Sequence, residues 1–247
     1  MSVKPGYSER RSNGSQLAGV LWDLDGTLID SRALWETAYH EFAEQQEIRL
    51  PSRFWEQING RTVEASVKLM FNHVGLIANR SAVERAGSWL TTRVGRLIED
   101  KPALLRWRPG AKEVLYAVQG AGLPTALVTT TWRFVTDRIL IALDARFDVT
   151  VCGDEVTQGK PAPDSYLRAA ALLDICLVSC LAVEDSPAGV AAAEAAGIAV
   201  LAVPYTTPIG PSRGRSVRSS LTGLTTIDLK AIHCFHRDRT DVQRPRL

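Results

Sequence analysis

The apolar positions of this chain follow two different periods. Short apolar runs predict buried strands, and the first of them lies at residues 19–22. From residue 31 to residue 106 the apolar residues recur at helical spacing instead, and no strand is predicted there. Further strands are predicted at 125–129, 148–152, 178–184 and 198–203, with helices near 132–143, 163–173 and 187–196. This alternation is typical of right-handed βαβ units and of a parallel sheet that is covered on both faces.

The helical segment is predicted to form one insert. Leu34, Ala38 and Phe42 share one face of its first helix. Thr62 is the expected N-cap of a second helix, and Ser81 with Glu84 has the spacing of a capping box at the start of a third. We therefore divide the chain into a core of residues 18–32 and 107–232 and an all-helical insert of residues 33–106.

The two ends of the chain lack this patterning. Residues 1–17 are rich in Ser, Gly and Arg and predict a disordered leader. Residues 205–220 hold several Pro and Gly and predict a loop, and a short helix is expected near Asp228. From 211 to 247 the chain has eight Lys and Arg against three Asp, so residues 233–247 are predicted to be a solvated basic tail.

Composition narrows the class of partner. The 247 residues carry a net charge of +2, too small a surplus to indicate nucleic acid or a membrane surface as the main partner. No run approaches the roughly 18 apolar residues of a membrane span, and no secretory signal is seen, so a cytoplasmic protein is expected. The four cysteines, and the run His233-Cys234-Phe235-His236, have no spacing that indicates a disulfide framework or a zinc site. A small molecule is the expected partner, and the residues indicate no oligomeric state.

Reactive side chains follow the predicted strands at four places. Asp23 and Asp25 come directly after the first strand. The other three places are Thr129, Lys160 just before Pro161 and Pro163, and the pair Glu184 and Asp185. Because the carboxyl ends of parallel strands meet at one edge of a sheet, we expect these side chains to lie together. Neighbouring carboxylates repel one another unless a cation or proton lies between them, and Mg²⁺ prefers oxygen ligands and shares its shell with substrate phosphates. The sequence therefore predicts a Mg²⁺ site facing a phosphoryl group, with Lys160 and Thr129 contacting that group.

The same four motifs resemble those of the haloacid dehalogenase superfamily. They are Asp23-Leu24-Asp25-Gly26-Thr27-Leu28-Ile29-Asp30-Ser31, Thr129, Gly159-Lys160-Pro161-Ala162-Pro163-Asp164 and Glu184-Asp185-Ser186-Pro187-Ala188-Gly189 followed by Ala195-Ala196-Gly197, in that family's order. The resemblance covers residues 19–230. It implies an α/β fold with a Rossmann-like parallel-sheet core and an inserted all-helical cap domain. This is the arrangement of the phosphoglycolate phosphatase and β-phosphoglucomutase branch.

The resemblance also implies a role for each motif residue. Asp23 would be the nucleophile that forms an aspartyl-phosphate, and Asp25 would protonate the leaving oxygen and then deprotonate the hydrolytic water. Thr129 and Lys160 would bind the transferring phosphoryl group. Mg²⁺ would be held by the carboxylates of Asp23 and Asp185, the backbone carbonyl of Asp25, and Glu184 directly or through water. Alternatively, Glu184 serves only to orient Lys160 or a metal-bound water.

Three reactions are weighed within this family. Dehalogenases need neither Mg²⁺ nor the second carboxylate, so Asp25 favours phosphoryl transfer. β-Phosphoglucomutases place a His twelve residues after the nucleophile and an Arg in the cap. Here Trp35 occupies the first position and Val63 the second, although Arg61 is close enough to compensate. The departure favours a phosphatase that hydrolyses a small phosphomonoester such as a sugar phosphate, with a phosphomutase as the alternative.

A different class of function is a non-catalytic binding module that uses the basic C-terminal tail. The presence of both Asp23 and Asp25 speaks against it. For the phosphatase, the candidate substrate-binding residues are Thr130, Arg61 and Arg133, and Trp35 and Trp132 are candidates for lining the substrate entrance. Cap opening would admit the substrate and cap closure would exclude water.

Overall fold

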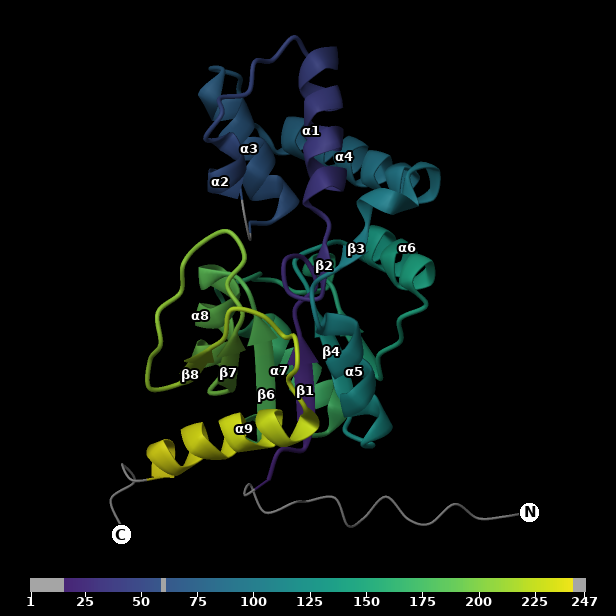
Figure 1. The fold of residues 1–247 in the computed structure, drawn as a ribbon. Coiled ribbons are helices and arrows are strands. Elements are labelled where there is room, and N and C mark those ends of the chain that lie inside the picture. The colour runs from purple at the N-terminus through teal and green to yellow at the C-terminus, as the bar shows by residue number, and fades with distance from the viewer. Residues whose placement is uncertain (1–15, 59–60, 242–247) are drawn as a thin grey trace, which may run out of the picture.

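Six parallel strands form one sheet within residues 16–58 and 61–241, the part of the chain that the computed structural model describes (Figure 1). The strand order is β5-β4-β1-β6-β7-β8. The strands are β1 Gly19–Trp22, β4 Thr125–Val128, β5 Val149–Val151, β6 Cys180–Glu184, β7 Ala199–Ala202 and β8 Arg215–Val217. The predicted α/β fold with a parallel sheet is confirmed.

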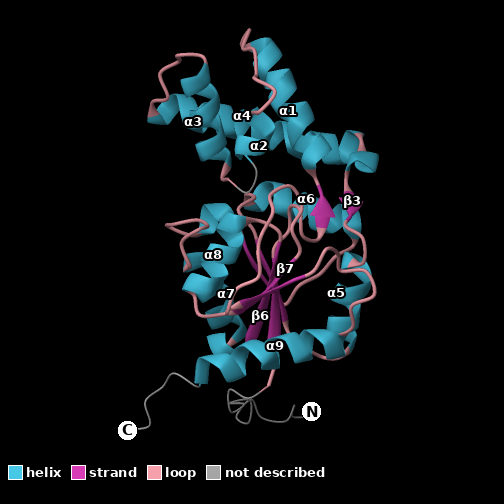
Figure 2. Cartoon of the chain, turned by 60° about the vertical axis from the view of Figure 1, so that its left-hand side comes forward, coloured by secondary structure: helices cyan, strands magenta, loops and turns pink. Residues whose placement is uncertain are grey.

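Helices cover both faces of the sheet (Figure 2). Val20 and Trp22 of β1 belong to a cluster with residues of α5 (Ala111–Gly120) and α9 (Thr226–Asp241). Leu21 between them belongs to the opposite cluster, with α7 (Asp164–Leu173) and α8 (Pro187–Ala195). Every residue of β1, β4 and β6 is buried, which explains why these strands are continuous apolar runs rather than alternating ones.

Four helices lie between β2 and β3 in the sequence and stand beyond one end of the sheet (Figure 1). They are α1 Arg32–Gln45, α2 Phe54–Ile58, α3 Val63–His73 and α4 Arg80–Asp100, and we call them the helical insert. The chain enters and leaves the insert through β2 (Ile29–Asp30) and β3 (Arg106–Trp107), an antiparallel pair. α4 packs against α6 (Arg133–Leu143) of the core, where Arg138 forms an ion pair with Glu99 at 3.3 Å. Short 3-10 turns lie at η1 Pro102–Leu104, η2 Gly153–Glu155 and η3 Leu177–Ser179.

The helix starts of the insert test two capping predictions. Thr62 caps α3 as predicted, since its hydroxyl accepts a hydrogen bond from the Ala65 amide at 3.2 Å. The predicted capping box of Ser81 and Glu84 is wrong. Asn79 caps α4 by accepting from the amide of Ala82 at 2.9 Å, so the helix begins earlier than predicted. The short helix α2 was not predicted, because five residues are too few to show a helical period.

The two ends of the chain differ from the prediction. Leu17, placed in the leader, is buried, while residues 1–15 of the leader lie outside the described residues. The predicted loop at 205–220 contains β8, a three-residue edge strand whose half-buried residues show no apolar run. α9 continues to Asp241, so the predicted basic tail from residue 233 begins inside this helix. No helix of the described part of the chain has the length and apolar character needed to cross a membrane.

Candidate functional site

Two adjacent central strands bring the predicted acids together at their carboxyl ends. Asp23 follows β1, and Asp185 follows β6, which pairs with β1 in parallel. Asp25 lies on the turn after β1, where Gly26 has φ +92. A Cβ atom at Gly26 would lie 2.2 Å from Asp185 Oδ2, so only glycine lets this turn approach the second acidic loop so closely.

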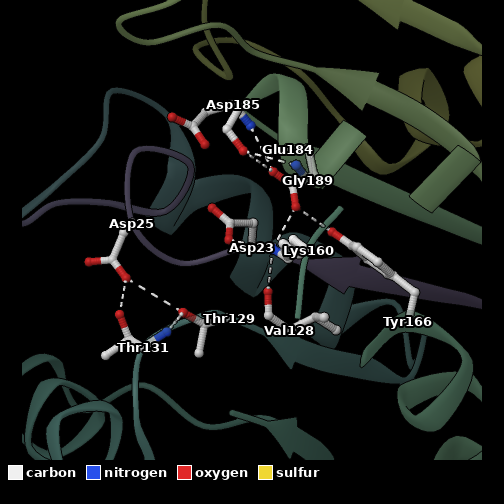
Figure 3. A network of polar contacts seen from close by, with 11 residues as sticks. Asp23, Asp25, Val128, Thr129, Thr131, Lys160, Tyr166, Glu184, Asp185 and Gly189 are labelled. Atoms are coloured by element: carbon white, nitrogen blue, oxygen red, sulfur yellow. Dashed lines mark hydrogen bonds and ion pairs between the residues drawn. The ribbon is translucent and has the colours of Figure 1, made fainter. Parts of the chain in front are cut away.

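Lys160 occupies the centre of the site (Figure 3). Its Nζ donates hydrogen bonds to Asp23 Oδ1 at 2.7 Å, to Glu184 Oε1 at 2.6 Å and to the carbonyl oxygen of Val128 at 2.9 Å. The Lys160 side chain is only 3% exposed. Burial alone would lower the pKa of Lys160, but the charges of Asp23 and Glu184 outweigh it and raise that pKa, so the ammonium stays charged.

Glu184 is a fully buried acid with all its oxygens engaged by the protein. Tyr166 donates to Oε1 at 2.6 Å, beside Lys160, and the amide of Asp185 donates to Oε2 at 3.2 Å. Burial and the nearby Asp23 raise the pKa of Glu184 to about 7. α8 passes close to this carboxylate: a Cβ at Gly189 would lie 2.0 Å from Glu184 Oε1. This geometry favours the orienting role for Glu184 over a direct metal ligand.

The carboxylates of the site are close enough together to bind a cation. One oxygen from each of Asp23, Glu184 and Asp185 lies within 4.8 Å of the others, and the described residues hold no second cluster of this kind. Asp23 Oδ2 is buried and has no hydrogen-bond partner. Burial, then Asp23 and Glu184, raise the pKa of Asp185 well above its usual value. Because the donors are all carboxylate oxygens and one of them lacks a partner, the residues fit Mg²⁺. The side chain of Asp25 is not part of this cluster.

Asp25 is held apart from the cluster by hydroxyl groups. The Thr131 hydroxyl donates to Asp25 Oδ2 at 2.7 Å, and the Thr129 hydroxyl contacts the same oxygen at 3.5 Å (Figure 3). The Ser31 hydroxyl donates to Oδ1. Trp35 lies beside this carboxyl group and acts to lower its pKa. Burial raises the pKa of Asp25 despite these donors, with a smaller contribution from Asp23. A fixed carboxyl group with a raised pKa suits proton transfer.

A cavity opens above these residues, between the sheet and the helical insert. Its empty space is about 1120 Å³, open solvent at the mouth included. Among the predicted residues that line it are Asp23, Asp25, Lys160, Asp185, Thr130, Arg61 and Trp35. Thr129 does not line it: the hydroxyl is buried and accepts a hydrogen bond from the Thr131 amide at 3.0 Å. Trp132, predicted at the entrance, does not line the cavity either.

Arg133 is a correction to the predicted substrate-binding set. It does not line the cavity, because its guanidinium lies beside η2 instead. Nη2 donates to both carboxylate oxygens of Glu155 at 2.9 Å and to the carbonyl oxygen of Thr150 at 2.7 Å. Arg133 therefore links the start of α6 to β5 and the loop after it. Its closeness to Thr131 in the sequence does not show this structural role.

Replacing Arg133 by Gln is expected to lower the free energy of unfolding by about 1–2 kcal/mol, because the ion pair is partly exposed and only its hydrogen bonds are lost. The Michaelis constant for substrate should change less than about twofold. Urea denaturation and steady-state kinetics measure both. Arg146→Gln, at a side chain that is 90% exposed, is the control. Unchanged stability with a large rise in the Michaelis constant would instead restore Arg133 to the substrate site.

Sequence reasoning missed four residues that build the site. Thr131 and Ser31 hold Asp25, Tyr166 holds Glu184, and Tyr205 lies at the cavity rim with the guanidinium groups of Arg32 and Arg108 at 4.5 and 3.9 Å from its ring. Thr131 is two residues beyond Thr129, and both contact Asp25. Tyr166 and Tyr205 carry no local signal, since they reach the site only through the packing of α7 and of the loop after β7. Ser31 lies six residues beyond Asp25, at the end of the first motif, but no role was assigned to it.

The chain is similar to known proteins in sequence and in fold. The haloacid dehalogenase-like hydrolase family matches residues 17–197. Hexitol phosphatase A from Escherichia coli (strain K12) is 34% identical over 193 residues, which cover 77% of this chain and 85% of that protein. Protein CbbY from Rhodobacter capsulatus is 31% identical over 201 residues, 76% of this chain and 86% of that protein. The crystal structure of β-phosphoglucomutase from Clostridium difficile has a TM-score of 0.78 at 18% identity, covering 92% of this chain and all of that one (100%), and shows the shared fold.

Proposed function

Because the chain belongs to the haloacid dehalogenase-like hydrolase family, an enzyme family, we propose that it is a Mg²⁺-dependent phosphatase of a small phosphomonoester, a sugar phosphate or a similar metabolite. The observation that carries this proposal is the buried cluster of Asp23, Lys160, Glu184 and Asp185 at the floor of a cavity. Relatives that are named phosphatases, such as hexitol phosphatase A, support the same reaction class.

Asp23 is the proposed nucleophile. Its Oδ1 accepts a hydrogen bond from Lys160 at 2.7 Å, whereas its Oδ2 has no hydrogen-bond partner. A carboxylate oxygen of Asp23 attacks phosphorus, the bond to the leaving oxygen breaks, and an aspartyl-phosphate forms. Lys160 lines the cavity floor beside Asp23, where its charge offsets that of the arriving phosphoryl group.

Asp25 is the proposed acid and base. Its carboxyl group lines the cavity and gives its proton to the leaving oxygen as the first bond breaks. The resulting carboxylate then takes a proton from the water that attacks the aspartyl-phosphate, which releases inorganic phosphate and restores Asp23. Ser31 and Thr131 hold the carboxyl group in place for both steps. Thr130, which lines the cavity, is a proposed contact for the phosphoryl oxygens.

Mg²⁺ would be held by Asp23 and Asp185, with Glu184 behind them. When bound, it would polarise the phosphoryl group and neutralise part of the negative charge that the acids and substrate bring together. The helical insert, which forms the other side of the cavity, is the proposed cap that admits substrate and excludes water.

Removing divalent metal with EDTA is expected to lower phosphate release by at least about 100-fold, since the charge stabilisation that the ion supplies is lost. Added Mg²⁺ should restore the rate. It should also raise the melting temperature, because an ion that binds only the folded state stabilises it. Asp185→Asn should lose most of that thermal shift, whereas Asp174→Asn, an exposed control, should keep it. The proposal would be contradicted if EDTA changed neither the rate of phosphate release nor the melting temperature.

A phosphomutase is the alternative reaction, and the same assay separates it. A mutase would return the phosphoryl group to the sugar with no net release of inorganic phosphate. A screen of phosphorylated metabolites that measures inorganic phosphate, with the Asp23→Asn variant as the blank, therefore tests the proposed function directly.

A further inference from the structure

The wall of the cavity opposite the acids is aromatic and apolar. It is built by three helices of the insert: α1 supplies Trp35 and Tyr39, α2 supplies Trp55 and Ile58, and α3 supplies Val63. Trp35 and Tyr39 are four residues apart and therefore share one face of α1. Because Trp35 and Asp25 line the same cavity, this wall shares the cavity with the proposed acid and base.

The aromatic wall is rigid. The ring of Tyr39 lies 6.5 Å from that of Trp35 and 6.1 Å from that of Trp55, the latter at an edge-on angle of 73°. Phe54, which has no exposed surface, packs behind both Tyr39 and Trp55, with ring centroids at 5.6 and 5.3 Å. Rings held by one another in this way form a preformed surface, so a ligand that stacks on them loses little side-chain freedom.

Part of the polar lining on the insert side is already engaged within the protein. The Ser66 hydroxyl donates to the carbonyl of Thr62 at 3.0 Å, and Arg61 Nε donates to the carbonyl of Gln57 at 2.6 Å. Arg32 and Glu36, at the start of α1, also line the cavity, and the Arg32 guanidinium stacks on the Tyr205 ring at 4.5 Å. The polar groups of the cavity lie mainly on the core side, where the phosphoryl group is expected. A polyol placed against Ile58, Val63 and the rings would bury hydroxyl groups without partners, which is unfavourable.

We propose that this wall selects phosphomonoesters whose alcohol carries a planar ring, of the kind found in nucleoside monophosphates, over simple polyol phosphates. The proposal rests on the proposed phosphatase function, which places the phosphoryl group at the acids. The planar ring stacks on Trp55 and its neighbours, and its apolar faces need no hydrogen bonds there. Trp55 is thus a specificity-determining residue.

The experiment compares uridine 5′-monophosphate with ribose 5-phosphate, which shares its phosphate, leaving oxygen and ribose but lacks the base. Binding is measured by titration calorimetry with Mg²⁺ on the Asp23→Asn variant, in which no turnover interferes. The nucleotide should bind at least about tenfold more tightly, the size of effect that one stacked base gives. Adding Trp55→Leu should reduce the ratio to less than about twofold, whereas Trp55→Phe, which keeps a ring, should preserve most of it.

Trp89→Leu is the matched control, because Trp89 packs on Phe42 at 5.3 Å in the insert and does not line this cavity. Equal or tighter binding of ribose 5-phosphate or of glucitol 6-phosphate would overturn the inference, as would an equal effect of Trp55→Leu on both ligands. Phosphate release by the unmodified chain decides the proposed function separately. If the chain hydrolyses ribose 5-phosphate but does not bind the nucleotide more tightly, the proposed phosphatase function stands and only the proposed role of the wall is refuted.

Discussion

Phosphate release is expected to fall by at least about 10⁴-fold when Asp23 is replaced by Asn, because the amide cannot act as the nucleophile. The substitution preserves the size and shape of the side chain. It also removes one of the buried negative charges around Asp185, so the fold should be retained. The measurement is single-turnover release of inorganic phosphate from the best substrate of a metabolite screen, with the melting temperature recorded alongside.

Asp144→Asn is the matched control for this result. Asp144 is 91% exposed and has a left-handed backbone conformation that Asn also tolerates. It should release phosphate at the rate of the unmodified chain. If Asp23→Asn kept more than about a hundredth of the activity while remaining folded, Asp23 would not be the nucleophile and the proposed aspartyl-phosphate would be refuted.

Replacing Lys160 by Met is expected to lower the free energy of unfolding by about 3–5 kcal/mol, because it leaves Asp23 and Glu184 buried without their common cation. Phosphate release should also be lost, since nothing then offsets the charge of the phosphoryl group. Urea denaturation measures the first effect. Lys230→Met, at an exposed position of α9, should leave stability within about 0.5 kcal/mol of the original.

A second substitution separates charge from packing in this experiment. If the loss of stability comes from the unpaired acids, Glu184→Gln should recover part of it when added to Lys160→Met. The double variant should then be more stable than the Lys160→Met single variant. A double variant that is less stable by the sum of the two single effects would show that the pairing of Lys160 with Glu184 does not account for the loss of stability.

The parts of the site that could be predicted are those that directly follow a strand. Asp23 and Asp185 are polar residues at the ends of buried apolar runs. A parallel sheet brings the carboxyl ends of its strands together, independently of the conformation of the connecting loops. Their partners could not be predicted in the same way. Tyr166 reaches Glu184 only through the packing of α7, which no short-range pattern encodes.

The predictions that were wrong concern positions where local signals compete or are absent. Asn79 and Ser81 are both good N-cap residues two positions apart, and the side-chain spacing to Glu84 favoured the wrong one. β8 is short and half-buried at the edge of the sheet, so it has neither the apolar run nor the alternation that marks a strand. Arg133 was misplaced because a sequence shows how near a residue is along the chain but not which way its side chain points.

The paired strands β2 and β3 make the insert exchangeable. Asp30 and Arg106 are neighbours in that pair, so the chain departs toward the helices and returns at one place. The aromatic rings of the insert line one side of the cavity, whereas Asp23, Asp25, Glu184 and Asp185 all belong to the core. A chimaera that carries another helical segment between these two residues would keep the reaction and take a new selectivity, which makes this junction a natural graft point for enzyme engineering.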